Sequence, residues 1–255
     1  INGTRLEPRD AGEYDMVVVG AGVAGMSAAV AAARLGLRVA LIGDRPVAGG
    51  NNSSEVRVHM GGRLGVGPYP QLGQLQQEFA PCREGNAQPA AYYEDQKKMQ
   101  WLQQEHGVSL FMGVHADGVT MDGTRIESVT ARNVLSGERL RFRAQLFADC
   151  TGDATIGYLA GADWRMGRES RSEYGESRAP ERADSLTMGA SVQWYASESK
   201  SRERFPLFEY GVVLNDSTAE RVLKGEWTWE TGMNRNQITE AERIRDYGLM
   251  VVYSN

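Results

Sequence analysis

Cysteines, histidines and long apolar runs are scarce in this sequence, and each shortage excludes a class of protein. Cys82 and Cys150 are the only cysteines, and they form no C-x-x-C pair. They therefore define neither a disulfide framework nor a metal site. The three histidines, His59, His106 and His115, lack ligand spacing, so no metal is expected. No apolar run approaches the roughly 20 residues that a membrane-spanning helix requires, so no membrane span is expected either.

An excess of positive charge is also missing. The formal net charge of the 255 residues is −5, whereas binding to nucleic acid requires a basic surface. We therefore expect no nucleic-acid partner. The length allows one large domain or two small ones. The chain begins at Ile1 rather than at a methionine, so the natural start is expected to lie upstream, and the sequence indicates a soluble protein without fixing its compartment.

The most informative stretch, residues 15–36, joins an apolar run to an alanine-rich segment through a G-x-G-x-x-G motif. Gly20 allows a tight strand-to-helix turn, Gly22 lets a pyrophosphate approach the backbone, and Gly25 lets helix and strand pack closely. The helix N-terminus then directs unpaired N–H groups at the phosphate. With a second strand expected at residues 38–42, the pattern favours a dinucleotide site over a βαβ unit that merely contains a tight turn.

The acid that normally binds the adenosine ribose is displaced in this chain. Such an acid lies at the end of the second strand, about 20 residues beyond the glycines. Here Gly43 is followed by Asp44. Either the acid comes one position late, or backbone contacts replace it.

The second informative stretch, residues 45–62, begins with a pair of glycines followed by short side chains that carry hydrogen-bond donors. If residues 54–60 are extended, a period of two places Glu55, Arg57 and His59 on one face. That polar face is either a reaction face beside a cofactor or the wet side of an edge strand.

The rest of the chain predicts a β-meander, followed by an exposed loop at residues 164–182 and a second layer. Trp227 and Trp229 alternate with polar residues, and they suit either stacking against a sugar face or an ordinary aromatic core. The expected helices are 71–79, 92–106, 154–160 and 238–245. Strands are expected at 108–114, within 118–134 and 138–147 with turns at 122–123 and 136–137, and at 185–196 and 249–253. The meander leads into residues 146–153, a strand that ends in Thr151-Gly152-Asp153.

These segments resemble the FAD-dependent oxidoreductases of the glutathione-reductase-like superfamily, and within it the branch labelled xanthan-lyase-related. The matching runs are VVVGAGVAGMSAAVAAARLGLRVALI, DRPVAGGNNSSEVRVHMGG, DCTGDATIGYLAGADWRMGRE, EWTWETG and AERIRDYGL. A glycine motif paired with a T-G-D at a later strand end is more specific than the glycine motif alone. The resemblance implies FAD rather than NAD.

The resemblance also implies which residues hold the cofactor. Glycine-turn residues would touch the diphosphate, the second glycine pair would lie along the flavin, and the T-G-D would close the far side. In the same order, these three sets are Gly20, Gly22, Val23, Ala24 and Gly25 for the diphosphate; Gly49, Gly50, Asn51, Asn52 and Ser53 for the flavin; and Thr151, Gly152 and Asp153 for the far side. By their positions, Gly43, Asp44, Arg45 and Ala116 complete the expected cofactor-binding set.

Two departures from the superfamily pattern bear on the organisation of the chain. Gly43 stands where the superfamily usually has glutamate, and no further glycine-containing strand–helix segment follows Asp184. We therefore expect a longer protein, whose remainder or a second subunit would be a partner. The expected organisation is a tail or linker at 1–14, a Rossmann-like α/β FAD-binding domain with a mainly parallel sheet and an inserted β-meander at 15–184, and the start of a mixed α/β substrate or cap domain at 185–255.

The favoured function is oxidation of a small organic substrate, with FAD accepting a hydride from an alcohol or amine carbon. A carbohydrate-derived substrate is preferred. His59 is the first candidate for the base, because imidazole titrates near neutral pH. Arg57 would hold an anionic or hydroxyl-rich substrate, or favour the reduced flavin. The alternatives are a lyase or isomerase with a retained FAD or NAD site, and a non-catalytic remnant of a flavoprotein fold.

Overall fold

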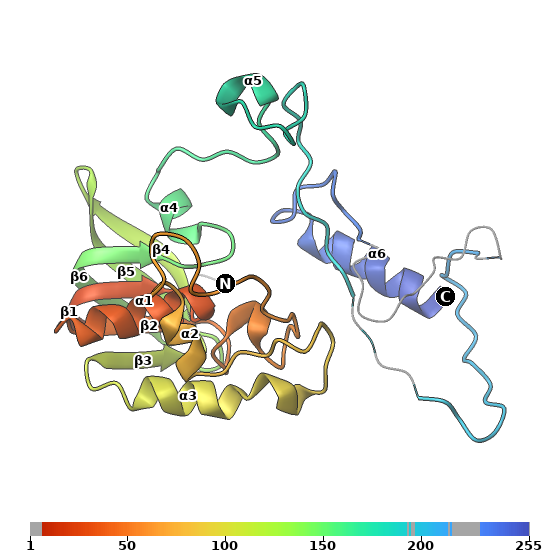
Figure 1. The fold of residues 1–255 in the computed structure, drawn as a ribbon, viewed down its shortest axis with the longest axis horizontal. Helices are drawn as coiled ribbons and strands as arrows, with labels where there is room; N and C mark the ends of the chain where they lie inside the picture. The colour runs from red at the N-terminus through yellow and green to blue at the C-terminus, as the bar shows by residue number, and fades with distance from the viewer. Residues whose placement is uncertain (1–6, 193, 195–196, 214, 216–229, 255) are drawn as a thin grey trace. The chain divides into compact units, whose positions relative to one another are not determined.

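A computed structural model describes residues 7–192, 194, 197–213, 215 and 230–254 (Figure 1). The chain divides into two compact units, residues 1–164 and 165–255. The first unit contains a six-stranded sheet with the strand order β3-β2-β1-β6-β5-β4. Its strands are β1 (Arg9–Val19), β2 (Val39–Gly43), β3 (Val108–Met112), β4 (Val114–Asp122), β5 (Arg125–Asn133) and β6 (Arg139–Asp149). Its helices are α1 (Val23–Arg34), α2 (Gln74–Glu78), α3 (Asp95–Gln103) and α4 (Thr155–Leu159), with short 3-10 turns η1 (Gly50–Asn52) and η2 (Ala90–Tyr93).

Strand β6 connects the parallel strands of the sheet to the antiparallel strands of the β-meander. It runs parallel to β1, which in turn runs parallel to β2, and β2 is parallel to β3. On its other edge, β6 pairs antiparallel with β5, and β5 pairs antiparallel with β4. This arrangement confirms the predicted α/β fold with a mainly parallel sheet and an inserted β-meander.

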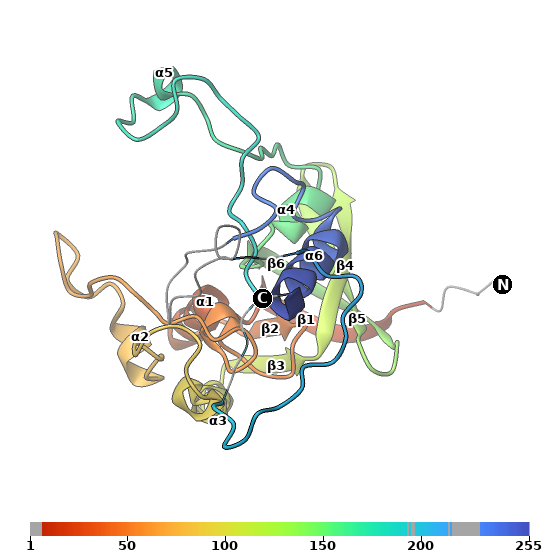
Figure 2. The same cartoon turned by 90° about the vertical axis from the view of Figure 1, so that its right-hand side faces the viewer.

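Two apolar clusters cover opposite faces of the parallel strands. Side chains alternate along a strand, so Val18 and Leu41 pack with α1 and α3, whereas Val17 and Ile42 pack with the meander. Figure 2 shows α1 and α3 on one side of β1 and β2, and β4 and β5 on the other. The central strands are therefore buried on both faces, as their nearly continuous apolar sequence requires.

Helix α1 begins directly after the glycine turn and ends just before Gly36. Its small residues allow a close approach to the sheet, and Ala29 and Val30 are fully buried. Gly36 adopts a φ of +93° just beyond the helix, and its amide donates to the Ala33 carbonyl at 2.9 Å. This left-handed glycine is the predicted helix stop.

Two sequence expectations near the first strands are wrong. Residues 9–14 were expected in the tail, but they belong to β1, because the long strand β6 offers them a partner starting at Leu140. Residues 54–60 do not form a strand. The Arg57 amide donates to the Ser53 carbonyl at 2.8 Å, and Arg57 itself has a φ of +61°, so the chain turns and the expected period of two is lost.

The second unit contains α5 (Arg171–Tyr174) and α6 (Ala241–Ser254). The strand expected at 249–253 is wrong, because those residues lie in α6. An apolar run of this length fits either structure, and burial of Ile244, Gly248 and Val251 at helical spacing favours the helix. Within 185–196, the described residues show a single β-bridge, Ala190 to Thr231, in place of the expected strand. No described helix combines the length and apolar character that crossing a bilayer requires.

An ion-pair network joins α1 to α2 and to the loop before β3. Arg34 Nη2 lies 2.7 Å from Glu78 Oε2 and 2.5 Å from Glu105 Oε1. Trp101 Nε1 donates to Glu78 at 2.9 Å. Arg34 first, and then Trp101, lower the pKa of the Glu78 carboxyl to about 2. Because Arg34 and Glu78 are both partly exposed, solvent screening limits what the pair contributes.

We expect Glu78→Gln to lower the free energy of unfolding by at most about 1 kcal/mol near neutral pH. The folded-state pKa of Glu78 lies below its unfolded value of 4.5, so this contribution is present above that pH and declines as the pH falls toward 2. Urea denaturation at about pH 7 and about pH 3 measures the difference between wild type and variant. A difference that grows in acid would contradict the prediction, and Glu127→Gln on the exposed side of β5 is the control.

Candidate functional site

The turn after β1 and the turn after β6 lie against each other. The Gly20 amide donates to the Ile42 carbonyl, and the Cys150 amide donates to the Val19 carbonyl, both at 2.8 Å. Gly20 has a φ of +104°, and a β-carbon there would lie 2.3 Å from the Cys150 carbonyl oxygen. Only glycine allows both this conformation and this contact. The glycine turn and Thr151 are thus neighbours.

A third turn, which contains Gly49 and Gly50, contacts the glycine turn that follows β1. The Gly49 amide donates to the Ala21 carbonyl at 2.9 Å. Gly50 has a φ of +58°, and a β-carbon there would lie 2.9 Å from the Gly22 α-carbon. The backbones of the two glycine turns are therefore in direct contact, with no room for a side chain between them.

Buried polar groups support the third turn from behind. Lys98 is fully buried, and its ammonium donates to the Asn52 and Tyr93 carbonyls, both at 2.5 Å. Burial lowers the pKa of Lys98, while the nearby Asp95 carboxylate opposes that shift. The Asn52 amide group donates to the Val58 and Cys82 carbonyls at 2.9 Å. The Asn52 side chain is thus engaged in fixing the loop.

Asp149, the last residue of β6, organises the turn that follows it. One carboxylate oxygen accepts from the Thr151 amide at 3.0 Å and from its hydroxyl at 2.6 Å. The other accepts from the Ile156 and Gly157 amides at 2.8 and 3.0 Å. Asp149 therefore holds residues 151–153 against the start of α4. Asp149 was not among the predicted site residues, because its bonds to the Ile156 and Gly157 amides form only in the folded chain.

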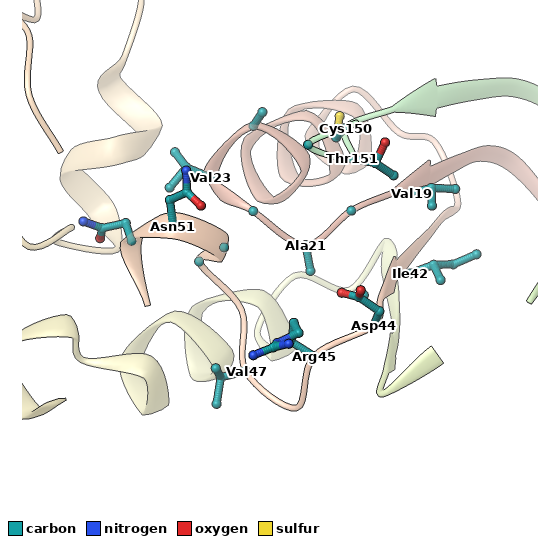
Figure 3. Close-up of a pocket in the computed structure, with 18 of the residues that line it drawn as sticks. Val19, Ala21, Val23, Ile42, Asp44, Arg45, Val47, Asn51, Cys150 and Thr151 are labelled. Carbon is teal, nitrogen blue, oxygen red and sulfur yellow. The ribbon is translucent and has the colours of Figure 1, made fainter. Parts of the chain in front are cut away.

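The three turns surround one cavity of about 630 Å³. It lies beyond the carboxyl ends of the parallel strands, where nucleotide sites occur in such sheets. Figure 3 shows Ala21, Asp44, Asn51 and Thr151 bordering this hollow from separate segments. The predicted site residues that line it are Gly20, Gly22, Val23, Ala24, Gly43, Asp44, Arg45, Gly49, Gly50, Asn51, Asn52, His59, Ala116, Thr151, Gly152 and Asp153.

Three predicted residues are not among those that line the cavity. Gly25 lies behind the first turn, where a β-carbon would come 1.8 Å from the Gly20 carbonyl oxygen. Ser53 is buried, and its hydroxyl accepts from the Glu55 amide at 3.3 Å. Arg57 Nε donates to the Ser54 carbonyl at 2.8 Å. Glu55 pairs with Arg45 at 2.6 Å, so Glu55, Arg57 and His59 do not form the single polar face that a strand would give.

Lining residues that sequence reasoning missed are mostly apolar or contribute backbone. Val47, Met60 and Cys150 belong to this group. Burial raises the pKa of the Cys150 thiol, which therefore stays protonated near neutral pH. The quoted sequence runs contain all three residues, but their apolar or thiol side chains gave no reason to select them, and only the folded chain brings them to one cavity.

The end of β2 shows why the acid expected to bind the ribose cannot stand at position 43. A β-carbon on Gly43 would lie 2.7 Å from the Ala21 side chain, so position 43 has no space for glutamate. Asp44, one residue later, lines the cavity. Its carboxylate lies 3.6 Å from His115 Nδ1. Contact of Asp44 with a ribose stays a prediction.

The first turn of α1 presents its backbone to the cavity. No side chain caps this end of the helix, no acidic residue lies in its first turn, and Gly22 to Ala24 line the cavity. Unpaired amides at a helix N-terminus attract phosphate oxygens. The fold is that of a Rossmann-like α/β protein, and its candidate site presents backbone groups of the kind that bind a diphosphate.

The chain belongs to the family of FAD dependent oxidoreductases, whose family model matches residues 15–247. FAD is therefore its cofactor, and the residues present fit it: uncapped helix amides and glycines without room for side chains surround the cavity, which has the size of a small-molecule site. No significant match was found among curated proteins. Among the described residues, no group of three or more His, Cys, Asp or Glu could hold a metal.

The fold is similar to several solved structures. FrdA of E. coli quinol fumarate reductase, in a mutant form, has 15% identity and a TM-score of 0.41, over 55% of this chain and 32% of that chain. THI4 of Thermovibrio ammonificans has 21% identity and a TM-score of 0.43, over 67% of this chain and 76% of that chain. A geranylgeranyl bacteriochlorophyll reductase-like protein of Thermoplasma acidophilum has 21% identity and a TM-score of 0.38, over 59% and 42%. The chain spans about a third of the length of FrdA.

We expect Gly20→Ala to abolish FAD binding and to destabilise the fold by roughly 2 kcal/mol or more, because the new methyl group meets the Cys150 carbonyl in a strained conformation. Flavin absorbance of the purified protein and its thermal unfolding measure both effects. Gly123→Ala, at a left-handed glycine between β4 and β5, is the control, since nothing lies within 4 Å of its β-carbon position and it does not line the cavity. Normal flavin content in Gly20→Ala would refute the assignment of this turn.

We also expect Asp149→Ala to weaken FAD binding by about tenfold while costing about 1–2 kcal/mol of stability, the range for a lost helix cap. Fluorescence titration of the flavin-free protein with FAD measures the affinity. Asp163→Ala, an exposed change beyond α4, should alter neither quantity. Equal FAD affinity of wild type and Asp149→Ala would show that the bonds of Asp149 to this turn do not contribute to binding.

Proposed function

We propose that this chain provides the FAD-binding part of an oxidoreductase that oxidises an alcohol or amine carbon of a small organic molecule. The observation that carries this proposal is the cavity between the Gly20–Gly22 turn, the Gly49–Asn52 turn and residues 151–153, at the uncapped end of α1. That geometry suits a diphosphate with groups extending from both ends.

Each part of the cavity has a proposed binding task. The amides at the start of α1 hold the diphosphate, and Asp44 accepts from a ribose hydroxyl at the end of β2. Residues 49–52 follow the flavin, with Lys98 keeping their backbone in place from below. Thr151 to Asp153 close the far side, in a position fixed by Asp149.

The chemistry requires a proton acceptor beside the bound substrate. FAD, when bound, supplies the acceptor for a hydride. The protein must remove a proton from the substrate hydroxyl or amine, and His59 is the proposed base because it is among the residues that line the cavity. Arg57 is proposed to hold an anionic or hydroxyl-rich substrate, although the Ser53–Arg57 turn places it outside the cavity lining described above.

The finer parts of the proposal concern the substrate and the rest of the protein. A carbohydrate-derived substrate and membership of the xanthan-lyase-related branch rest on the resemblance of the sequence runs. Trp227 and Trp229, the proposed stacking residues, lie outside the described residues. Residues 185–255 are proposed as the start of a substrate or cap domain, completed by the remainder of a longer chain or by a second subunit.

We expect His59→Ala to slow substrate-dependent flavin reduction by about 100-fold or more, the scale of general-base catalysis, with unchanged FAD content. Anaerobic mixing with candidate sugars and amines, followed by flavin absorbance, measures the rate. His106→Ala, an exposed change, is the control. Undiminished reduction in His59→Ala would remove it as the base.

The same experiment separates oxidation from lyase or isomerase chemistry. An oxidoreductase reduces one flavin for each product molecule until an external electron acceptor is added. Product formation without flavin reduction, and without consumption of an acceptor, would identify a lyase or isomerase. A wild-type protein that remains colourless after reconstitution with FAD would instead identify a non-catalytic remnant.

A further inference from the structure

The loop at residues 82–87 pairs with the segment that carries His59. The Met60 amide donates to the Cys82 carbonyl, and the Ala87 amide donates to the Arg57 carbonyl, both at 2.8 Å. Between these bonds, Asn86 is buried and faces His59. The position of Asn86 is therefore set by backbone bonds on either side of it.

Two hydrogen bonds from His59 converge on one oxygen of Asn86. The His59 amide lies 3.0 Å from Asn86 Oδ1, and His59 Nδ1 lies 2.7 Å from the same atom. A backbone amide can only donate, so the Asn86 atom facing it must be the oxygen rather than the nitrogen. A carboxamide oxygen can only accept, so Nδ1 must carry a proton.

A neutral imidazole has one protonated nitrogen, so protonation of Nδ1 leaves Nε2 with a free lone pair. Nε2 lies on the side of Gly61, whose β-carbon position is 3.9 Å from it. Gly61 and His59 both line the cavity. The basic nitrogen of the ring is thus the one on the side of the cavity-lining Gly61.

We infer that Asn86 is a positioning residue that keeps the proton of His59 on Nδ1, so that Nε2 is the atom that accepts the substrate proton. This inference rests on the proposed function for its catalytic part. In the reaction, the hydroxyl or amine proton moves to Nε2 and the ring becomes an imidazolium. The electron pair of that broken bond forms the C=O or C=N bond, and the C–H hydrogen leaves with its electron pair to FAD.

Nitrogen-15 NMR of the histidine rings tests the positioning role without substrate or activity. The chain has three histidines, so the spectrum of His59→Ala identifies the His59 signals. We expect the neutral His59 ring to show the Nδ1–H tautomer in wild type and in Asn86→Asp, which keeps an acceptor. Asn86→Leu should give mixed tautomers, and Glu84→Gln, an exposed change in the same loop, is the control. An Nε2–H tautomer in wild type would overturn the inference.

Kinetics then test the catalytic part. Asn86→Leu should lower kcat for flavin reduction by about tenfold or more, because rings that carry the proton on Nε2 cannot accept the substrate proton there, with little change in KM. Asn86→Asp should restore most of this loss. If His59→Ala keeps full activity while the NMR result holds, the proposed base is wrong but Asn86 still fixes the tautomer. If Asn86→Leu keeps full kcat with mixed tautomers, Asn86 has no positioning role in catalysis.

Discussion

The site depends on three backbone segments that touch without side chains between them. Gly20 meets the Cys150 carbonyl, and Gly50 meets the Gly22 α-carbon, each at a distance that a β-carbon would make impossible. These contacts expose amides and carbonyls to the cavity. The proposed diphosphate would therefore meet peptide groups that are already in place, and ordering them at the moment of binding would cost little conformational entropy.

Polar side chains hold these segments from behind. Lys98 and Asn52 bind carbonyls beneath the Gly49–Asn52 turn, and Asp149 binds amides and a hydroxyl behind Thr151. Because buried polar groups are costly when they lack partners, the buried Lys98 and Asn52 favour a single conformation of their turn. Asp149 is exposed, and it fixes its turn through the several hydrogen bonds that its carboxylate accepts. Side chains thus hold in place the backbone turns that surround the cavity.

Much of the fold could be predicted from the sequence because its signals are local. The glycine motif, the alternating meander strands and the glycine stop at Gly36 each act over a few residues. The regions whose structure differs from the prediction depend on contacts with residues that are distant in the sequence. Residues 9–14 become a strand only because β6 is long enough to pair with them, and residues 249–253 become helical through the burial of one face of α6. In the site, the glycines were predictable, whereas Asp149, Lys98 and Asn86 act through contacts that only the folded chain creates.

The double pairing of β6 links the meander to the cofactor cavity. Strand β6 pairs with β5 along one edge and with β1 along the other, and these pairings fix its register. Its last residue is Asp149. A single residue inserted within β6 would turn the following side chains to the opposite face and move Asp149 along by about 3.3 Å. Length variation among natural relatives should therefore concentrate at the hairpin tips near residues 123 and 136, while the length from 139 to 149 stays constant.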